Sequence, residues 1–481
     1  MNYGIVVKIL GSILIIDSFF LVPPLLIALI QNERSTTAFA VTLAVTLIAG
    51  FLMSRIRIKN KEIKAKEGLA IVTFGWLAIS ISGAFPFYLG GSVPTYIDAL
   101  FETISGFTTT GASIISNVEV LDKSIQFWRS FTHWIGGMGI LVFTIALLPA
   151  IGMGSFHLFK AESPGPMAGK IAPRIKDTAR FLYISYISLT LLEIIFLRLG
   201  GLSFFDSAVY TFGTVGTGGF GVYNDSVAGF SSYIHFVIGI FMVLSGINFS
   251  LHFYLYTRRF KEIVEDTELR NYLRFILFST VLIMLNLFFT KYGNLFVSFR
   301  DSFFQVSSIM TTTGYSTADF DLWPTFSKLI LFVLMFVGGS AGSTGGGIKV
   351  IRIVVLMKLI KREVSKIFHP RAYAPVKLGR KAISNDIVAR VNSFVALHVI
   401  VFILGSLLIS LEGVDFLTAI SSVAATLNNI GPGFEMVGPT TNFAFFSGPS
   451  KLLLSFLMLL GRLELFTVLA LLVPGSWTKE S

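Results

Sequence analysis

The sequence predicts an all-α polytopic membrane protein with four internal repeats, and three observations support this. Of the 481 residues, 53% are hydrophobic and 14% are charged, whereas about a quarter of the residues of a soluble domain are charged. The apolar residues come in runs of about twenty, the length that an α-helix needs to cross a bilayer core. A short phrase containing threonine and glycine recurs between these runs.

Composition narrows the classes further. The chain contains no cysteine, which excludes disulfides, thiolate metal sites and cysteine nucleophiles. The first apolar stretch, 4–30, is longer than a signal-peptide core and lacks a small-residue cleavage pattern, so we expect a retained helix. The net charge of +11 is better explained by basic loops on the cytoplasmic side of a membrane than by nucleic-acid binding.

Ten apolar spans are expected, at 4–30, 37–54, 68–90, 127–153, 181–200, 230–256, 272–290, 327–357, 391–411 and 450–474. Four loops, 55–66, 154–180, 257–274 and 349–390, hold 27 of the 38 Lys and Arg residues. Placing these loops in the cytoplasm with ten crossings puts both termini there as well.

The repeated phrase lies between alternate spans. It reads DALFETISGFTTTGAS at 98–113, DSAVYTFGTVGTGGFG at 206–221 and DSFFQVSSIMTTTGYS at 301–316, with a weaker copy, LTAISSVAATLNNIGPG, at 417–433. In the first three copies an aspartate stands thirteen residues before the aligned glycine, and Thr418 takes that place in the fourth. We expect Asp98, Asp206 and Asp301 to be N-caps of short helices rather than ion ligands.

A repeat of this kind dictates the architecture. Each unit should be a helix, a short re-entrant helix, a glycine loop and a second helix. The expected division is an N-terminal two-helix segment at 1–66, followed by pore repeats at 67–154, 155–258, 259–365 and 366–481, the third with a broken second helix.

The glycine loops are the candidate functional elements. Irregular backbone at membrane depth is tolerated only when it is buried in protein or lines a water-filled path. Four loops on one axis, each behind the negative C-terminal end of a short helix, would form a carbonyl-lined site for a dehydrated monovalent cation. One copy alone would be better explained as a turn or a helix-packing motif, but four matched copies favour a filter. The expected lining is Thr109, Thr110, Gly111, Thr217, Gly218, Gly219, Thr312, Thr313, Gly314, Asn429, Ile430 and Gly431.

Over nearly its whole length the chain resembles the Trk/Ktr/HKT superfamily of potassium transporters, specifically the Trk-type membrane (pore) subunit. The likeness rests on the four repeats, the extra N-terminal helix pair, ESPGPMAGKIAPRIKDTA (162–179), GGSAGSTGGGIK (338–349), NNIGPG (428–433) and GRLELF (461–466). The resemblance implies uptake of K⁺ through a pseudo-fourfold pore, a homodimer in the membrane lipid, and a cytosolic nucleotide-binding regulatory subunit. It also implies the bacterial cytoplasmic (inner) membrane.

In that family, glycine at the key position of all four filters goes with potassium preference, and serine in the first goes with sodium. All four positions are glycine here. The second filter, TVGTGGF, and the fourth, LNNIGPG, depart from the TTTG form. The filter should therefore be only loosely fourfold and less strict than a symmetric one.

The glycine-rich loop GGSAGSTGGGIK interrupts the span 327–357. Each glycine costs a helix about 1 kcal/mol relative to alanine, so we expect a coil inside the membrane, beside the conduction path. A P-loop is rejected because Ile348 stands between Gly347 and Lys349. Close helix packing through small residues is the remaining alternative. The resemblance favours a movable gate that includes Gly345, Gly346 and Gly347.

Arg462 is the second candidate gate residue. It stands twelve residues into the last span, roughly 18 Å deep at 1.5 Å per residue, and should face the bundle interior or a watery cavity. One interpretation is an ion pair with another span, through Glu193 or Glu102, since Glu464 is two residues away and faces elsewhere. The other is a fixed positive charge below the filter that raises the barrier to cations, and the resemblance places a matching arginine there.

Function follows from these elements. The expected activity is potassium-selective, channel-like uptake, with no enzymatic role, because no catalytic groups converge and the six histidines show no metal-ligand spacing. No nucleotide-binding domain is visible in the chain, so nucleotide control must come with the partner. The alternative is a sodium- or proton-coupled potassium symporter, but acids within the spans are few: Asp17, Glu193 and Glu464.

Overall fold

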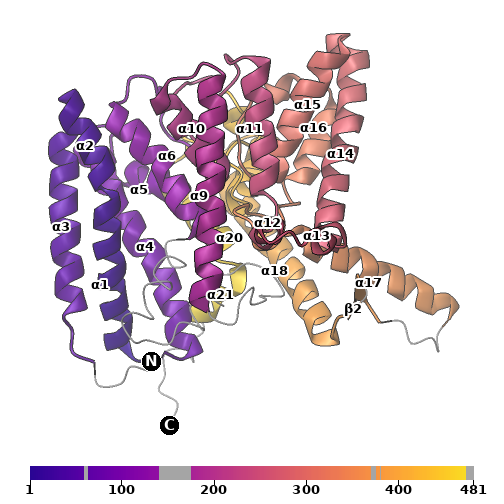
Figure 1. Cartoon of the computed structure of the whole chain (residues 1–481), viewed down its shortest axis with the longest axis horizontal. Helices are drawn as coiled ribbons and strands as arrows, with labels where there is room; N and C mark the ends of the chain where they lie inside the picture. The colour runs from indigo at the N-terminus through magenta and orange to yellow at the C-terminus, as the bar shows by residue number, and fades with distance from the viewer. Residues whose placement is uncertain (59–62, 140–174, 370–374, 380, 473–481) are drawn as a thin grey trace.

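The computed structural model describes residues 1–58, 63–139, 175–369, 375–379 and 381–472. In this part of the chain nearly every element is a helix, and most of the long helices run side by side in one bundle, from whose lower end α17 (Val350–Phe368) projects (Figure 1). The β-structure of the described residues is a hairpin of two-residue strands, β1 (Lys377–Leu378) and β2 (Lys381–Ala382), and an isolated bridge between Val337 and Ile348. The all-α membrane fold expected from the sequence is confirmed.

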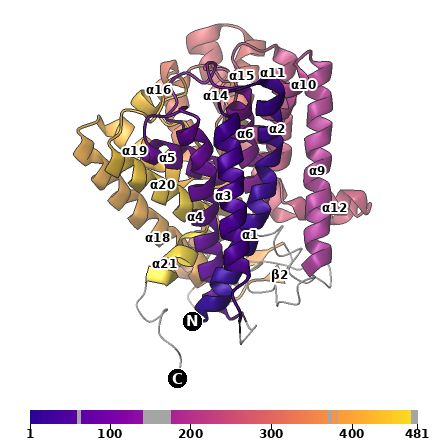
Figure 2. The ribbon, with the colours of Figure 1, turned by 90° about the vertical axis from the view of Figure 1, so that its left-hand side faces the viewer.

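Three helices precede the repeats and cover one side of the bundle (Figure 2): α1 (Tyr3–Phe20), α2 (Val22–Gln31) and α3 (Thr36–Ser54). The second and third residues of α2 are prolines, which the first helical turn accepts. α1 and α3 touch through glycines, because a β-carbon at Gly11 would lie 2.7 Å from the carbonyl oxygen of Gly50. Small residues of this kind let helices approach closely in a membrane.

The order long helix, short helix, irregular stretch, helix then occurs four times. The first unit contains α4 (Ala65–Leu89), α5 (Tyr96–Phe107) and α6 (Lys123–Met138). The second contains α9 (Ile175–Leu199), α10 (Phe204–Gly216), α11 (Ser232–Ser245) and α12 (Phe249–Tyr256). The third contains α13 (Phe260–Val264), α14 (Thr267–Leu287), η1 (Phe288–Tyr292), α15 (Leu295–Met310), η2 (Phe320–Leu322), α16 (Thr325–Leu334) and α17 (Val350–Phe368). The fourth contains α18 (Asn385–Ile409), η3 (Ser410–Glu412), α19 (Phe416–Leu427), η4 (Glu435–Val437), α20 (Gly448–Arg462) and α21 (Leu465–Leu472).

Six predicted spans are apolar helical segments long enough to cross a membrane: Tyr3–Gln31, Thr36–Ser54, Lys66–Leu89, Arg180–Leu199, Thr267–Tyr292 and Asn385–Glu412. Two others are sharply bent rather than straight: α11 and α12 meet at 96°, and α20 and α21 at 116°. Of the span 127–153, the part beyond 139 lies outside the described residues. The remaining expected span, 327–357, is interrupted between α16 and α17 by the glycine-rich loop, as its glycine content predicts.

The helix caps differ from the prediction. Asp98 and Asp206 are the third residues of their helices, and the N-caps are Thr95 and Ser203, whose hydroxyl groups accept the backbone N–H of those aspartates. Each hydroxyl also donates to the aspartate carboxylate. The aspartates therefore complete the cap from the third position, the place that glutamate occupies in a capping box.

In the third unit the short helix begins earlier, at Leu295, and its N-cap is Asn294. Asp301 lies inside this helix and pairs with Arg300. The prediction of an aspartate N-cap was thus wrong for all three copies, because spacing from the glycine does not specify where the first helical turn starts.

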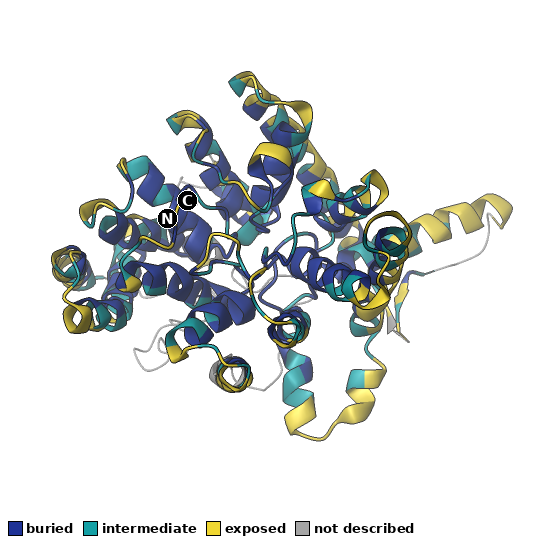
Figure 3. Cartoon of the chain, turned by 90° about the horizontal axis from the view of Figure 1, so that it is seen from above, coloured by how far each residue is buried: buried dark blue, intermediate teal, exposed yellow. Residues whose placement is uncertain are grey.

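Burial is arranged as in a membrane protein. Seen down the bundle, buried residues fill the centre and exposed ones lie at the rim (Figure 3). The centre includes polar side chains of the short helices, such as Ser105 and Thr426, both 0% exposed, while apolar side chains such as Leu52 and Leu277 are about two-thirds exposed at the rim. An apolar exterior around a partly polar centre is what lipid-facing helices require.

Candidate functional site

The four glycine loops share one backbone conformation. We call the residues 109–111, 217–219, 312–314 and 429–431 the four triplets; they contain all the predicted lining residues. Each triplet has a left-handed first residue, with φ of 55° at Thr109, 57° at Thr217, 58° at Thr312 and 55° at Asn429. Each ends on a left-handed glycine, with φ of 78° at Gly111, 82° at Gly219, 87° at Gly314 and 100° at Gly431. Left-handed non-glycine residues cost of order 1–3 kcal/mol each and cluster at functional sites, where the surroundings hold them.

The third glycines show that the triplets meet in a closed ring. A β-carbon at Gly111 would lie 1.9 Å from the carbonyl oxygen of Gly218, and one at Gly219 would lie 2.1 Å from that of Thr313. The series continues from Gly314 to the carbonyl oxygen of Ile430 at 2.2 Å, and from Gly431 to that of Thr110 at 2.7 Å. Each glycine therefore abuts the next triplet in cyclic order, and the fourth abuts the first. The approach leaves no room for a side chain at any of the four.

Short helices end directly behind the ring. α5 ends at Phe107, α10 at Gly216, α15 at Met310 and α19 at Leu427, one or two residues before each triplet. A helix C-terminus carries about half a negative charge. Four such ends around one ring favour a cation within it.

Hydrogen bonds between side chains hold the triplets in place. Thr108 and Thr110 share a hydrogen bond of 2.8 Å between their hydroxyl groups, and the third unit repeats this at 2.7 Å with Thr311 and Thr313. The fourth triplet instead uses Asn429, whose side-chain N–H groups donate to the hydroxyl of Thr110 and to the carbonyl oxygen of Met458. The ring is thus conformationally fourfold but chemically asymmetric.

Two cavities lie toward opposite ends of the triplets, and we call the one at the third-position glycines the outer cavity and the one at the glycine-rich loop the inner cavity. The outer cavity contains the third-position glycines and is rimmed by polar residues that include Ser116, Asn224 and Asn442. The inner cavity is lined by residues 342–347 of the glycine-rich loop together with Lys349, Arg462 and Glu464. First-position residues face this inner side, because Thr109 and Thr312 accept hydrogen bonds from Arg462 and from the loop.

The two ends of the glycine-rich loop, 338–349, are hydrogen-bonded to each other, and the loop contacts the ring. Its ends pair through the N–H of Gly338 and the carbonyl oxygen of Ile348, 2.9 Å apart. The N–H of Gly346 donates to the hydroxyl of Thr312 at 2.6 Å. A β-carbon at Gly346 would lie 2.5 Å from the carbonyl oxygen of Asn428, so the approach requires glycine there.

Arg462 joins the loop to the ring. Its guanidinium donates to the carbonyl oxygen of Thr344 at 2.8 Å, to the hydroxyl of Thr109 at 3.2 Å, and to the carbonyl oxygens of Gly136 and Gly137. The side chain also lies over the ring of Trp76. It is held chiefly by main-chain oxygens at the inner mouth of the ring.

The predicted ion-pair partners of Arg462 were wrong. Glu102 pairs with Arg129, and within the described residues neither carboxylate oxygen of Glu193 accepts a hydrogen bond. Glu464 pairs with Arg352, in line with the expectation that it faces away from Arg462. The helix also ends at Arg462 instead of continuing, because Glu464 adopts a left-handed conformation with φ of 60°.

Sequence reasoning missed the residue that holds both ends of the glycine-rich loop. The carboxylate of Glu268, at the start of α14, accepts the N–H of Ala341 at 2.8 Å and that of Ile351 at 3.0 Å. Lys349 is buried and donates to the carbonyl oxygen of Gly345. Glu268 stands in a charged run and carries no local signal that separates it from solvated neighbours.

Comparison with known proteins places this geometry among transporters. The family model TrkH, described as cation transport protein, matches residues 32–477. The Trk system potassium uptake protein TrkH of Halomonas elongata is 37% identical, with both chains covered over 100% of their length. The protein of that name from Escherichia coli (strain K12) is 38% identical over 99% of this chain and 100% of its own. The crystal structure of the potassium transporter TrkH from Vibrio parahaemolyticus superposes with a TM-score of 0.89 at 34% identity, covering 99% of this chain and 100% of that one.

Proposed function

The chain belongs to the TrkH family of cation transport proteins, and on this premise we propose that it is the membrane subunit of a Trk potassium uptake system. Potassium crosses the bilayer through the ring of four triplets, which serves as the selectivity filter. The single observation that carries this proposal is the cyclic contact of Gly111, Gly219, Gly314 and Gly431, each with the next triplet's carbonyl oxygen. The proposal includes the division of the chain into units at 66, 154, 258 and 365.

Carbonyl oxygens in such a ring replace the hydration shell of a dehydrated cation. Four helix C-termini add negative potential at the same place. The hydroxyl pairs behind the first and third triplets have no equivalent behind the second, where the hydroxyl of Thr217 donates to the carbonyl oxygen of Gly216. We therefore expect discrimination between potassium and sodium that is real but weaker than in a symmetric filter.

The gate in this proposal is the glycine-rich loop, at Gly345, Gly346 and Gly347, acting together with Arg462. Both lie against the inner face of the filter, and the bond from Arg462 to Thr344 ties them to each other. Opening requires that the loop leave the filter. A cytosolic nucleotide-binding subunit would control this movement from the basic segments 257–274 and 349–390, and the chain would work as a homodimer in the cytoplasmic membrane.

The proposed topology puts both termini in the cytoplasm. The start of α1 lies at the lower end of the bundle (Figure 1). The turn between α2 and α3 is at the other end, where Glu33 accepts the backbone N–H of Lys123 in the segment that follows the first triplet. The outer cavity and this turn would therefore face the outside.

Potassium flux is the direct test of the function. Purified protein in liposomes with a potassium gradient, at equal pH on both sides and without sodium, is expected to carry a current that reverses at the potassium equilibrium potential. When sodium replaces potassium on one side, the reversal potential should shift, and the shift should report a lower permeability for sodium than for potassium. A current that requires a sodium or proton gradient would instead establish a coupled symporter, and no flux with or without the soluble partner would contradict both.

Glu268 provides a test of the gate. Glu268→Ala removes the acceptor from two backbone N–H groups, and charge-assisted bonds contribute about 1.5–3 kcal/mol each. The loop should then leave the filter more often, and potassium flux without the partner should rise about fivefold or more. Glu268→Gln keeps an acceptor oxygen and is the matched control. Wild-type flux in a folded Glu268→Ala protein would show that the loop does not gate.

A further inference from the structure

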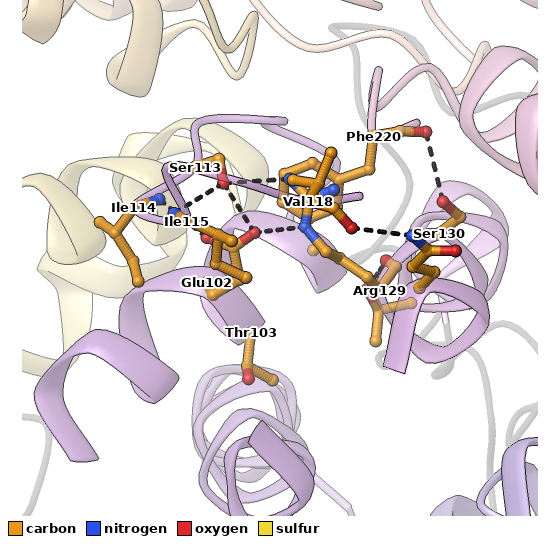
Figure 4. A network of polar contacts seen from close by, with 12 residues as sticks. Glu102, Thr103, Ser113, Ile114, Ile115, Val118, Arg129, Ser130 and Phe220 are labelled. Atoms are coloured by element: carbon orange, nitrogen blue, oxygen red, sulfur yellow. Dashed lines mark hydrogen bonds and ion pairs between the residues drawn. The ribbon is translucent and has the colours of Figure 1, made fainter. Parts of the chain in front are cut away.

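A buried ion pair lies behind the filter on the outer side of the first unit. The guanidinium of Arg129 on α6 donates to the carboxylate of Glu102 on α5 (Figure 4). Arg129 is 4% exposed and Glu102 is fully buried. A buried pair contributes to stability only when its remaining donors and acceptors are also satisfied, and here the additional partners all belong to the segments that follow the filter.

Glu102 holds the chain that leaves the first triplet. Its carboxylate accepts the N–H of Ile114 at 2.9 Å and the hydroxyl of Ser113 at 3.0 Å. These residues stand two and three positions after Gly111. The carboxylate thus sets the direction in which the first triplet exits the ring.

Arg129 extends the same network to the second triplet. It donates to the hydroxyl of Ser113 at 3.0 Å and to the carbonyl oxygen of Gly221 at 3.2 Å. Its guanidinium also lies 3.7 Å from the centre of the Phe220 ring, a favourable cation–π position. One side chain therefore joins the exits of two adjacent triplets.

Two further residues of α6 contact the same stretch. The hydroxyl of Ser130 donates to the carbonyl oxygen of Phe220 at 3.2 Å. The imidazole of His133 is within hydrogen-bonding distance of the carbonyl oxygen of Gly106 and accepts the N–H of Phe220 at 3.3 Å. Through these contacts α6 joins the chain segments that flank the first two triplets.

The other units lack this pair. Nine residues before the third-position glycine, where the first unit has Glu102, the others have Tyr210, Gln305 and Ser422. Tyr210 donates to the carbonyl oxygen of Ser226, and the amide of Gln305 has no hydrogen-bond partner among the described residues. The ion pair of Glu102 and Arg129 is therefore a feature of the first unit and makes the surroundings of the ring asymmetric.

We propose that Glu102 and Arg129 are positioning residues for ion selectivity, which keep the first two triplets at the spacing that fits potassium. Neither needs to contact the ion, because both act on the main chain that leaves Gly111 and Gly219. Where selectivity depends on how closely the cavity fits the ion, a filter whose carbonyl oxygens are free to close around a smaller cation loses its preference for potassium. The inference rests on the proposed filter function of the ring.

Glu102→Gln tests the proposal. The amide of glutamine has one acceptor oxygen, so it cannot accept hydrogen bonds from Arg129, Ser113 and Ile114 as the carboxylate does. The potassium-to-sodium permeability ratio in liposomes is therefore expected to fall about tenfold. Potassium flux itself should change less than this ratio, because the ring remains assembled. A merely structural residue would lower the amount of active protein and leave the ratio as it was.

Asp98→Asn is the matched control. Asp98 lies on the same helix and forms a buried pair with Lys451 at 2.6 Å, but its carboxylate accepts from Thr95 and Lys451 rather than from the segments after the triplets. Its replacement should lower thermal stability and leave the permeability ratio unchanged. An equal loss of selectivity in Asp98→Asn would overturn the proposal.

Ser113→Ala covers the case in which Glu102→Gln does not fold. It removes the hydroxyl that joins both charged groups to the first triplet and leaves the ion pair intact, and it should lower the permeability ratio about threefold. Wild-type selectivity in both Glu102→Gln and Ser113→Ala would overturn the positioning role while the filter proposal stands. A wild-type protein without potassium preference would instead contradict the filter proposal itself.

Discussion

Replacing Gly111 by serine is expected to reduce potassium flux more than tenfold and to remove the preference for potassium over sodium. Gly111 has φ of 78°, and a β-carbon there would lie 1.9 Å from the carbonyl oxygen of Gly218. The left-handed conformation costs a non-glycine residue about 1–3 kcal/mol, and the overlap must be relieved by moving the second triplet. Because about 1.4 kcal/mol corresponds to a tenfold change in an equilibrium, the backbone cost alone is large enough to change occupancy of the site.

Gly91→Ser is the control for backbone strain. Gly91 has φ of 68°, and a β-carbon there would meet nothing within 4 Å. It lies in the turn before α5, in the same unit. Gly91→Ser should therefore lower stability slightly and leave flux and selectivity as in the wild type. Rubidium and sodium uptake in liposomes should be measured for both variants. A Gly111→Ser protein that keeps the preference for potassium over sodium would contradict the filter proposal.

Arg462→Ala is expected to increase potassium flux about tenfold in the absence of the soluble partner. The substitution removes a positive charge from the inner mouth of the filter and the bond that holds the loop at Thr344. Two like charges 4 Å apart repel by about 4 kcal/mol at an effective dielectric constant of 20. Partial relief of such a barrier accounts for a tenfold change.

Arg462→Lys separates the two contributions of this residue. Lysine keeps the charge but cannot span the carbonyl oxygens of Gly136, Gly137 and Thr344 as the guanidinium does. If the charge dominates, flux through the lysine variant stays low; if the tether dominates, it rises as in Arg462→Ala. Unchanged or reduced flux in a well-folded Arg462→Ala protein would refute both roles.

Several structural expectations from the sequence are confirmed, and they rest on local physics. An apolar run of about twenty residues predicts a crossing helix, and in the described part of the chain six of the ten expected spans are helical segments long and apolar enough to cross a membrane. The interruption at 338–349 follows from the cost of glycine in a helix. The irregular backbone between each short helix and the next helix was likewise expected from the repeated phrase.

Other features depended on how the helices pack. The bend of 116° after Arg462 and the cap at Thr95 were not visible, because helix ends are decided by contacts as well as by composition. The partners of buried charges were also missed. The rule that singled out Arg462 by its depth does not select Arg129, because Arg129 is only two residues after the start of the expected span 127–153.

The sequence by itself determined that this chain is an all-α membrane protein in which a phrase of threonine and glycine recurs between the apolar helices. These properties belong to single helices and turns, so chain-local hydrophobicity and conformational preference suffice to predict them. Only the tertiary structure decided that Gly431 closes the ring against Thr110, that Glu102 pairs with Arg129, and that Glu268 holds the glycine-rich loop. Such contacts join residues far apart in the chain, and they depend on the rotation and register of packed helices, which no local pattern specifies.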